Sequence, residues 1–190
     1  MAFLRYGRKN GGLKTRVACC LGLCIILANG VSMKMQAQDI EEYQLKAAFL
    51  LNFTKFISWP HADVSSRLTV CIVSAKDVAE ALEAVTRGKS AAGRQVVVQE
   101  LRSPAPLETC QLLFIGSQGK KVEEILEEAR NLPIVTVSED DKFLRRGGMI
   151  NFVLADGKLR FEINFAAASR AGISISSKLL QLAIKVYEKP

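Results

Sequence analysis

The stretch from Gly147 to Ala183 constrains the fold of this chain more than any other part of the sequence. It opens with a Gly-Gly pair and continues with two runs in which apolar and polar residues alternate, joined by Asp156-Gly157. Such alternation is typical of a half-buried strand, and an Asp-Gly pair between two such runs is a strong signal for a two-residue hairpin turn. The turn sets six antiparallel pairs: Ala155 with Lys158, Leu154 with Leu159, Val153 with Arg160, Phe152 with Phe161, Asn151 with Glu162, and Ile150 with Ile163.

This register gives the hairpin two different faces, because successive side chains of a strand point to opposite sides. One face is wholly apolar and is expected to join the core: Ile150, Phe152, Leu154, Leu159, Phe161 and Ile163. The other, here called the polar face, carries Met149, Asn151, Val153, Arg160, Glu162 and Asn164. Periodicity leaves the role of the polar face open between an outer surface, internal hydrogen bonding to the final helices, and a binding surface.

Continuous apolar runs and apolar residues at helical spacing predict further strands and helices along the chain. Apolar runs predict strands over 68–73, 94–99, 112–115 and 134–137, and spacings of three and four predict helices over 39–58, 78–86, 121–130, 165–170 and 177–189. Ser138 is expected to cap a short helix that contains Glu139, Asp140 and Asp141, and Lys46 is expected on the narrow polar side of the first helix. Strands alternating with helices predict an α/β fold: a single three-layer sandwich with a mostly parallel sheet, ending in the antiparallel β-hairpin and flanked by helices.

The first 37 residues have the form of a secretory signal peptide. A basic region up to Arg16 precedes an apolar run from Val17 to Ala28, which is shorter than the roughly 20 residues of a transmembrane helix. Cleavage is expected between residues 30 and 37, which leaves 38–190 as an exported α/β domain; an uncleaved membrane anchor is the alternative. Removing the six basic residues of the leader lowers the formal net charge from +7 to +1, which argues against a nucleic-acid partner.

Cleavage also simplifies the cysteines, because three of the five leave with the leader. Cys71 and Cys110 remain, and an even count in an exported chain suggests one disulfide. Two buried free thiols are the alternative.

No convincing catalytic or cofactor site emerges from the residue types. His61 is the chain's single histidine, so a Ser-His-Asp triad would depend on it, and it follows Trp59-Pro60 as an ordinary turn residue would. Two cysteines are too few for a structural zinc site. The segment FIGSQGKK, Phe114 to Lys121, leads from a strand into a helix but lacks the glycine spacing and the hydroxyl of a phosphate-binding loop. We therefore expect no cofactor, no metal and no enzymatic activity.

Two blocks of the sequence resemble a known family. YQLKAAFLLNFTKFISWP, Tyr43 to Pro60, and the Gly147–Ala183 stretch together are similar to the YfiR family of periplasmic proteins, over nearly all of residues 39 to 187. The resemblance implies a repressor of a membrane-bound diguanylate cyclase, a homodimer, and an outer-membrane lipoprotein as a candidate for relieving repression. A further cysteine pair that some relatives carry is missing, since Arg145 and Phe152 occupy that region. Redox control is therefore not implied.

On that family analogy, the polar face and its surroundings are expected to bind the partner protein. The residues concerned are Arg145, Arg146, Asn151, Arg160, Glu162, Asn164, Ser169 and Arg170. Two other classes of function remain open at this point. One is a periplasmic small-molecule receptor that feeds a sensor kinase or transporter, and the other is an esterase-like enzyme that depends on His61.

Overall fold

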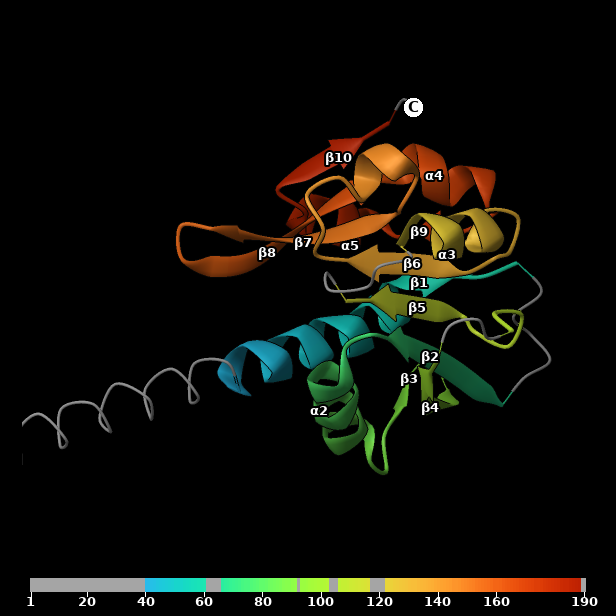
Figure 1. Cartoon of the computed structure of the whole chain (residues 1–190), viewed down its shortest axis with the longest axis vertical. Helices are drawn as coiled ribbons and strands as arrows, with labels where there is room; N and C mark the ends of the chain where they lie inside the picture. Colours follow the sequence, from blue (N-terminus) through green and yellow to red (C-terminus); the bar gives the residue numbers. More distant parts are fainter. Residues whose placement is uncertain (1–39, 61–65, 92, 103–105, 117–121, 189–190) are drawn as a thin grey trace, which may run out of the picture. The chain divides into compact units, whose positions relative to one another are not determined.

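Figure 1 shows a computed structural model of the chain, which describes residues 40–60, 66–91, 93–102, 106–116 and 122–188. The chain divides into two units, Met1–Glu41 and Glu42–Pro190, and the second contains all the described residues except Ile40 and Glu41. The expected leader, His61 and most of the Phe114–Lys121 segment lie outside the described residues.

The described residues form short helices and strands that alternate along most of the chain. The strands are β1 (Ile57–Ser58), β2 (Arg67–Val73), β3 (Ser90–Ala91), β4 (Arg94–Leu101), β5 (Leu112–Ile115), β6 (Val135–Ser138), β7 (Ile150–Ala155), β8 (Lys158–Asn164), β9 (Ser174–Ile175) and β10 (Lys185–Tyr187). The helices are a first helix over residues 40–56, α2 (Lys76–Thr86), α3 (Val122–Ala129), the 3₁₀ turn η2 (Leu144–Arg146), α4 (Phe165–Arg170) and α5 (Ser177–Leu182).

Eight strands build the main sheet in the order β10-β8-β7-β6-β5-β2-β4-β3. The pairs from β7 through β6, β5 and β2 to β4 are parallel, whereas β7–β8 and β3–β4 are antiparallel. This confirms the predicted α/β class and the mostly parallel sheet with an antiparallel hairpin. The parallel strands β5 and β6 are fully buried and β2 is largely buried, as expected for strands that helices cover on both sides, whereas β4 is largely exposed or half-buried.

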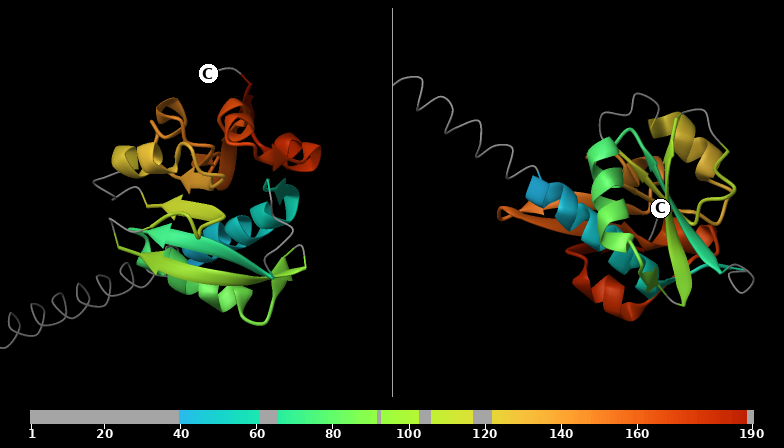
Figure 2. Two further views of the ribbon diagram at one scale, coloured as in Figure 1. Left: turned by 90° about the vertical axis from the view of Figure 1, so that its right-hand side faces the viewer. Right: turned by 90° about the horizontal axis from the view of Figure 1, so that it is seen from below.

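Two apolar clusters lie on opposite faces of the sheet. The larger includes Leu68, Val70 and Ile72 of β2, and joins them to the first helix and α2. The smaller includes the alternate residues Cys71 and Val73, and joins them to α3. Figure 2 shows helices on both sides of the strands, which matches the three layers expected from the sequence.

The hairpin has the predicted register at all six pairs. Asp156 and Gly157 take φ angles of 52° and 68°, as a two-residue hairpin turn requires. At the base of the hairpin, the rings of Phe152 and Phe161 pack against Phe53 of the first helix, with centroids 5.8 and 5.0 Å apart.

The apolar face is buried only along the base of the hairpin. Ile150, Phe152, Phe161 and Ile163 are at most 3 % exposed, but Leu154 near the turn is 76 % exposed. The expectation that the whole face joins the core is therefore wrong at the tip. Figure 1 shows the physical reason, since the tip of β7–β8 extends beyond the neighbouring strands.

The last predicted helix, 177–189, is too long. It ends at Leu182, and the chain continues as β10, which pairs in parallel with β8 through Lys185–Glu162, Val186–Ile163 and Tyr187–Asn164. The hairpin is consequently not the edge of the sheet, because β10 covers β8. β-Branched and aromatic residues such as Val186 and Tyr187 favour a strand when an unpaired edge is available to them.

Two other element boundaries also differ from the prediction. Ser138 is the last residue of β6, and its hydroxyl donates to the Ile115 carbonyl oxygen at 2.6 Å, so it cannot cap a helix. The predicted short helix is replaced by a turn and η2. The first helix ends at residue 56, because Ile57 and Ser58 pair with β9.

Cys71 of β2 and Cys110, just before β5, form a disulfide with their Cα atoms 5.8 Å apart. Both residues are essentially buried in the smaller apolar cluster beside Leu101 and Leu113. The bond closes a loop with a sequence separation of 39 residues that includes β3 and β4. It therefore links β2 to the start of β5, the strand that pairs with it.

Replacing both cysteines, Cys71→Ala with Cys110→Ala, is expected to lower the free energy of unfolding by about 4 kcal/mol, the chain-entropy value for a loop of this length. Urea unfolding followed by circular dichroism measures the loss, and reduction of the unmodified protein should reproduce it. An unfolding free energy that is unchanged by both treatments would contradict a bonded pair.

Candidate binding site

The polar face of the hairpin borders a cavity of about 550 Å³, here called the hairpin cavity. Its walls come from β7, β8, β10, the end of α4 and the loop over residues 139–148. The lining residues are Asp141, Leu144, Arg145, Gly147, Asn151, Glu162, Asn164, Arg170 and Tyr187. The predicted polar face thus borders a concave site rather than a flat surface.

Of the eight residues expected from the sequence to bind a partner, five line this cavity: Arg145, Asn151, Glu162, Asn164 and Arg170. Arg146 lines a neighbouring cavity. Arg160 and Ser169 are exposed and line neither. Four lining residues are not among those expected from the sequence: Asp141, Leu144, Gly147 and Tyr187. The sequence pattern predicts a helix at Tyr187 and a helix turn at Asp141, and neither placement brings these side chains to the hairpin.

Asn164 lines the cavity, but its side chain has a structural role because it forms two hydrogen bonds within the protein. Its Oδ1 accepts a hydrogen bond from the Ala167 amide at 2.9 Å and caps α4, while its Nδ2 donates to the Leu144 carbonyl oxygen at 3.1 Å. The first bond satisfies a helix N-terminus, and the second ties η2 to β8. Of the alternatives left open by the sequence, internal hydrogen bonding therefore applies to Asn164.

Asn151 is different, because its side chain is buried without being satisfied. The residue is 3 % exposed, and among the described residues its Oδ1 is the one buried side-chain oxygen or nitrogen without a hydrogen-bond partner. Leaving such an atom unpaired costs about 1–3 kcal/mol. Directly across the hairpin lies Glu162, whose carboxylate accepts a hydrogen bond from the Tyr187 hydroxyl at 3.3 Å.

Two arginines on the rim carry charges that no carboxylate of the described residues neutralises. Arg145 follows the first residue of η2, and Arg170 is the last residue of α4; both side chains are exposed. Arg146 behaves differently, since its Nε lies 3.0 Å from Glu123 of α3 and its guanidinium lies 3.5 Å from Asp140. Arg145 and Arg170 are therefore available to an anion, whereas Arg146 fastens the loop to α3.

Both glycines before β7 are required by the shape of this loop. Gly147 has a φ of 97°, which disfavours any residue with a side chain. A Cβ at Gly148 would overlap the ring of Phe143, which is completely buried. The Gly-Gly pair therefore lets the rim of the cavity turn tightly over the smaller apolar cluster.

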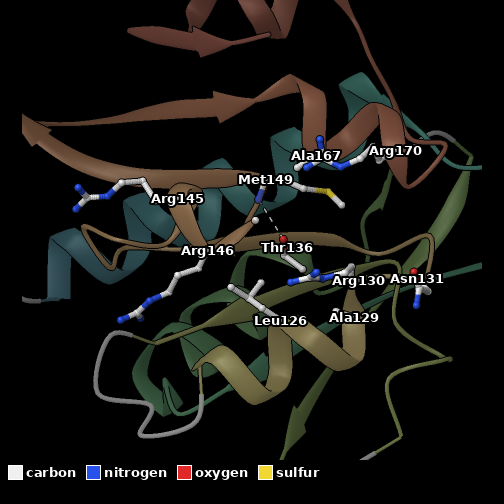
Figure 3. Close-up of a pocket in the computed structure, with 11 residues that line it drawn as sticks. Leu126, Ala129, Arg130, Asn131, Thr136, Arg145, Arg146, Met149, Ala167 and Arg170 are labelled. Atoms are coloured by element: carbon white, nitrogen blue, oxygen red, sulfur yellow. Dashed lines mark hydrogen bonds between the residues drawn. The ribbon is translucent and has the colours of Figure 1, made fainter. Parts of the chain in front are cut away.

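A second cavity of about 590 Å³ lies beside the first and is shown in Figure 3. It shares Arg145, Gly147 and Arg170 with the hairpin cavity and adds residues of α3 and β6. Figure 3 shows the side chains of Arg145 and Arg146 extending away from Thr136 and Met149 at its centre. Thr136 has a structural role there, because its hydroxyl oxygen accepts a hydrogen bond from the Met149 amide at 3.1 Å.

The loop over residues 139–148 is also tied to the first helix through Lys46. This lysine is 3 % exposed and forms ion pairs with Glu42, at 2.6 Å, and with Glu139. Its predicted place on the narrow polar side of the helix does not leave it exposed, because Glu139 pairs with it there. Burial by itself would lower the pKa of Lys46, but hydrogen bonds to Glu139 and Glu42, and their charges, outweigh it and raise the pKa above 10.5.

A raised lysine pKa means that folding favours the protonated amine. The contribution of Lys46 to the free energy of unfolding is therefore complete below its pKa in the unfolded state. We expect that contribution to be lost as the pH rises above about 10.5, through the higher pKa of the folded state. In the Lys46→Met variant, stability should fall less steeply over this range. Urea unfolding from pH 8 to pH 11.5 checks this, and identical pH dependence in both proteins would contradict the account.

The described residues thus form an α/β domain with a charged concave site beside the hairpin, an arrangement suited to a binding domain. The YfiR/HmsC-like family model matches residues 43–184, and the chain belongs to that family. The family comprises periplasmic, non-catalytic regulators of the diguanylate cyclase pathway. No curated protein matches this chain.

Two further features of the described residues concern membranes and metal ions. Within the described ranges, no helix is both long enough and apolar enough to cross a membrane. In the same part of the chain, histidine, cysteine and acidic side chains do not gather in any group of three that could hold a metal ion.

Proposed function

We propose that this protein binds the periplasmic sensing domain of an inner-membrane diguanylate cyclase and holds the enzyme inactive. Repression would lower cyclic di-GMP signalling and biofilm formation. The observation that carries the proposal is membership of the YfiR/HmsC-like family over residues 43–184. Export through the leader over residues 1–37, with the protein acting as a periplasmic homodimer, is part of the proposal, as is relief of repression by an outer-membrane lipoprotein.

The surface that we assign to the partner is the rim of the hairpin cavity. Arg145 and Arg170 stand exposed there without carboxylate partners among the described residues, and Tyr187 lies beside them. Arginine and tyrosine are enriched at the energetically dominant positions of protein interfaces. An acidic group of the sensing domain that pairs with the two arginines would supply specificity and speed association.

Deleting the gene is expected to raise cellular cyclic di-GMP, and the wild-type gene should restore the low level. The double variant Arg145→Glu with Arg170→Glu should fail to restore it, because two favourable pairs become two like-charge contacts. Cyclic di-GMP extracted from the cells is measured by mass spectrometry, with the amount of each protein checked by immunoblotting.

The matched control reverses two charges on a distant, exposed part of the chain: Arg87→Glu with Lys89→Glu, just after α2. This variant should repress as the wild type does. An unchanged cyclic di-GMP level in the deletion strain would sink the proposed function. Full repression by the Arg145→Glu/Arg170→Glu variant would instead contradict the assignment of the cavity rim as the partner-binding surface.

A further inference from the structure

We infer that the hairpin cavity is a binding site for a small zwitterion, a molecule with a primary ammonium at one end and an anionic group at the other. The site shares Arg145 and Arg170 with the surface assigned to the partner, but the inference rests on the cavity, its charges and one unsatisfied buried oxygen rather than on the proposed repression. The volume of about 550 Å³ lies within the roughly 300–1,000 Å³ typical of small-molecule sites.

The ammonium end is recognised by Asn151 and Glu162. Asn151 Oδ1 is a buried acceptor without a donor, and Glu162 sits opposite it in the β7–β8 pair. Directly opposite residues of an antiparallel pair have their Cβ atoms about 5 Å apart. A single ammonium has three N–H donors and can therefore reach both acceptors at once.

The ammonium is favoured over a neutral donor for an electrostatic reason. The carboxylates of Glu162 and Asp141 both line the cavity, and Glu162 already accepts a hydrogen bond from the Tyr187 hydroxyl. That bond orients the Glu162 carboxylate toward β10 and leaves its other acceptor sites free. A charged donor gains more from two carboxylates in a partly enclosed site than an amide or hydroxyl would.

The anionic end is recognised by Arg145 and Arg170. Both line the hairpin cavity, and no described carboxylate pairs with either of them. A guanidinium binds a carboxylate or a phosphate through two parallel hydrogen bonds, which fixes the orientation of the ligand as well as its charge. Because the site holds two acidic and two basic side chains, a molecule with one charge of each sign leaves it balanced.

The probes are a series of ω-amino acids of increasing length: glycine, β-alanine, 4-aminobutyrate and 6-aminohexanoate. Titration calorimetry on the purified protein should show saturable binding of at least one member. Butylamine, butyrate and the N-trimethyl derivative of 4-aminobutyrate each lack one of the required groups, so they should bind at least about tenfold more weakly than the best probe, the loss expected for one hydrogen bond to a charged group.

Two variants test whether the ligand binds in this cavity. Asn151→Leu removes the unsatisfied acceptor and keeps the number of side-chain heavy atoms, so the protein should remain folded and lose at least about tenfold in affinity. Arg170→Gln changes an exposed side chain and should cause a comparable loss. Arg160→Gln is the matched control, because Arg160 lies on β8, the strand of Glu162, but outside the cavity, and its change should leave affinity unaltered.

Three results would overturn the inference. The first is that no probe of the series binds, and the second is that single-charge analogues bind as tightly as the zwitterions. The third is that affinity survives both Asn151→Leu and Arg170→Gln. These measurements use the protein without any partner, so their failure is distinct from a failure of the proposed repression.

Discussion

The packing of two pairs of phenylalanine rings is the interaction on which the rest of this structure depends. Phe49 and Phe53 of the first helix meet Phe152 and Phe161 of the hairpin, with ring centroids between 5.0 and 6.0 Å apart. Aromatic pairs at such distances add about 0.5–1.5 kcal/mol each beyond the area that they bury. They also fix which side of the hairpin faces inward. A one-residue slip would turn every side chain to the other face, so this packing determines that Asn151 and Glu162 border the hairpin cavity.

The rim of that cavity is held by contacts of different kinds. Asn164 bonds the Leu144 carbonyl, Arg146 pairs with Glu123, and Lys46 pairs with Glu139. These three contacts tie the loop over residues 139–148 to β8, α3 and the first helix respectively. A site supported on several sides keeps its geometry when a ligand or a partner arrives, which reduces the entropy lost on binding. Arg145 and Arg170 thus project from a rim that these three contacts hold in place.

Local signals in the sequence were sufficient to predict the hairpin but not its surroundings. Asp156-Gly157 and strict alternation fix the turn and the register within one short segment, and the structure confirms all six pairs. The path of β10 depends on the free edge of β8, which no local pattern encodes, so Tyr187 was assigned to a helix. The burial of Lys46 depends in the same way on Glu139, more than 90 residues away in the chain. The unsatisfied state of Asn151 Oδ1 could be found only once every neighbouring donor was placed.

Hydrogen–deuterium exchange of this protein with and without the periplasmic domain of the cyclase tests the central claim most directly. The claim is that the base of the hairpin's apolar face packs into the core and that the rim of the hairpin cavity receives the partner. We expect the partner to slow exchange in the loop over residues 139–148 and around Arg170, with little change in α2 and β4. Protection confined to α2 and β4, with unchanged exchange along the cavity rim, would contradict it.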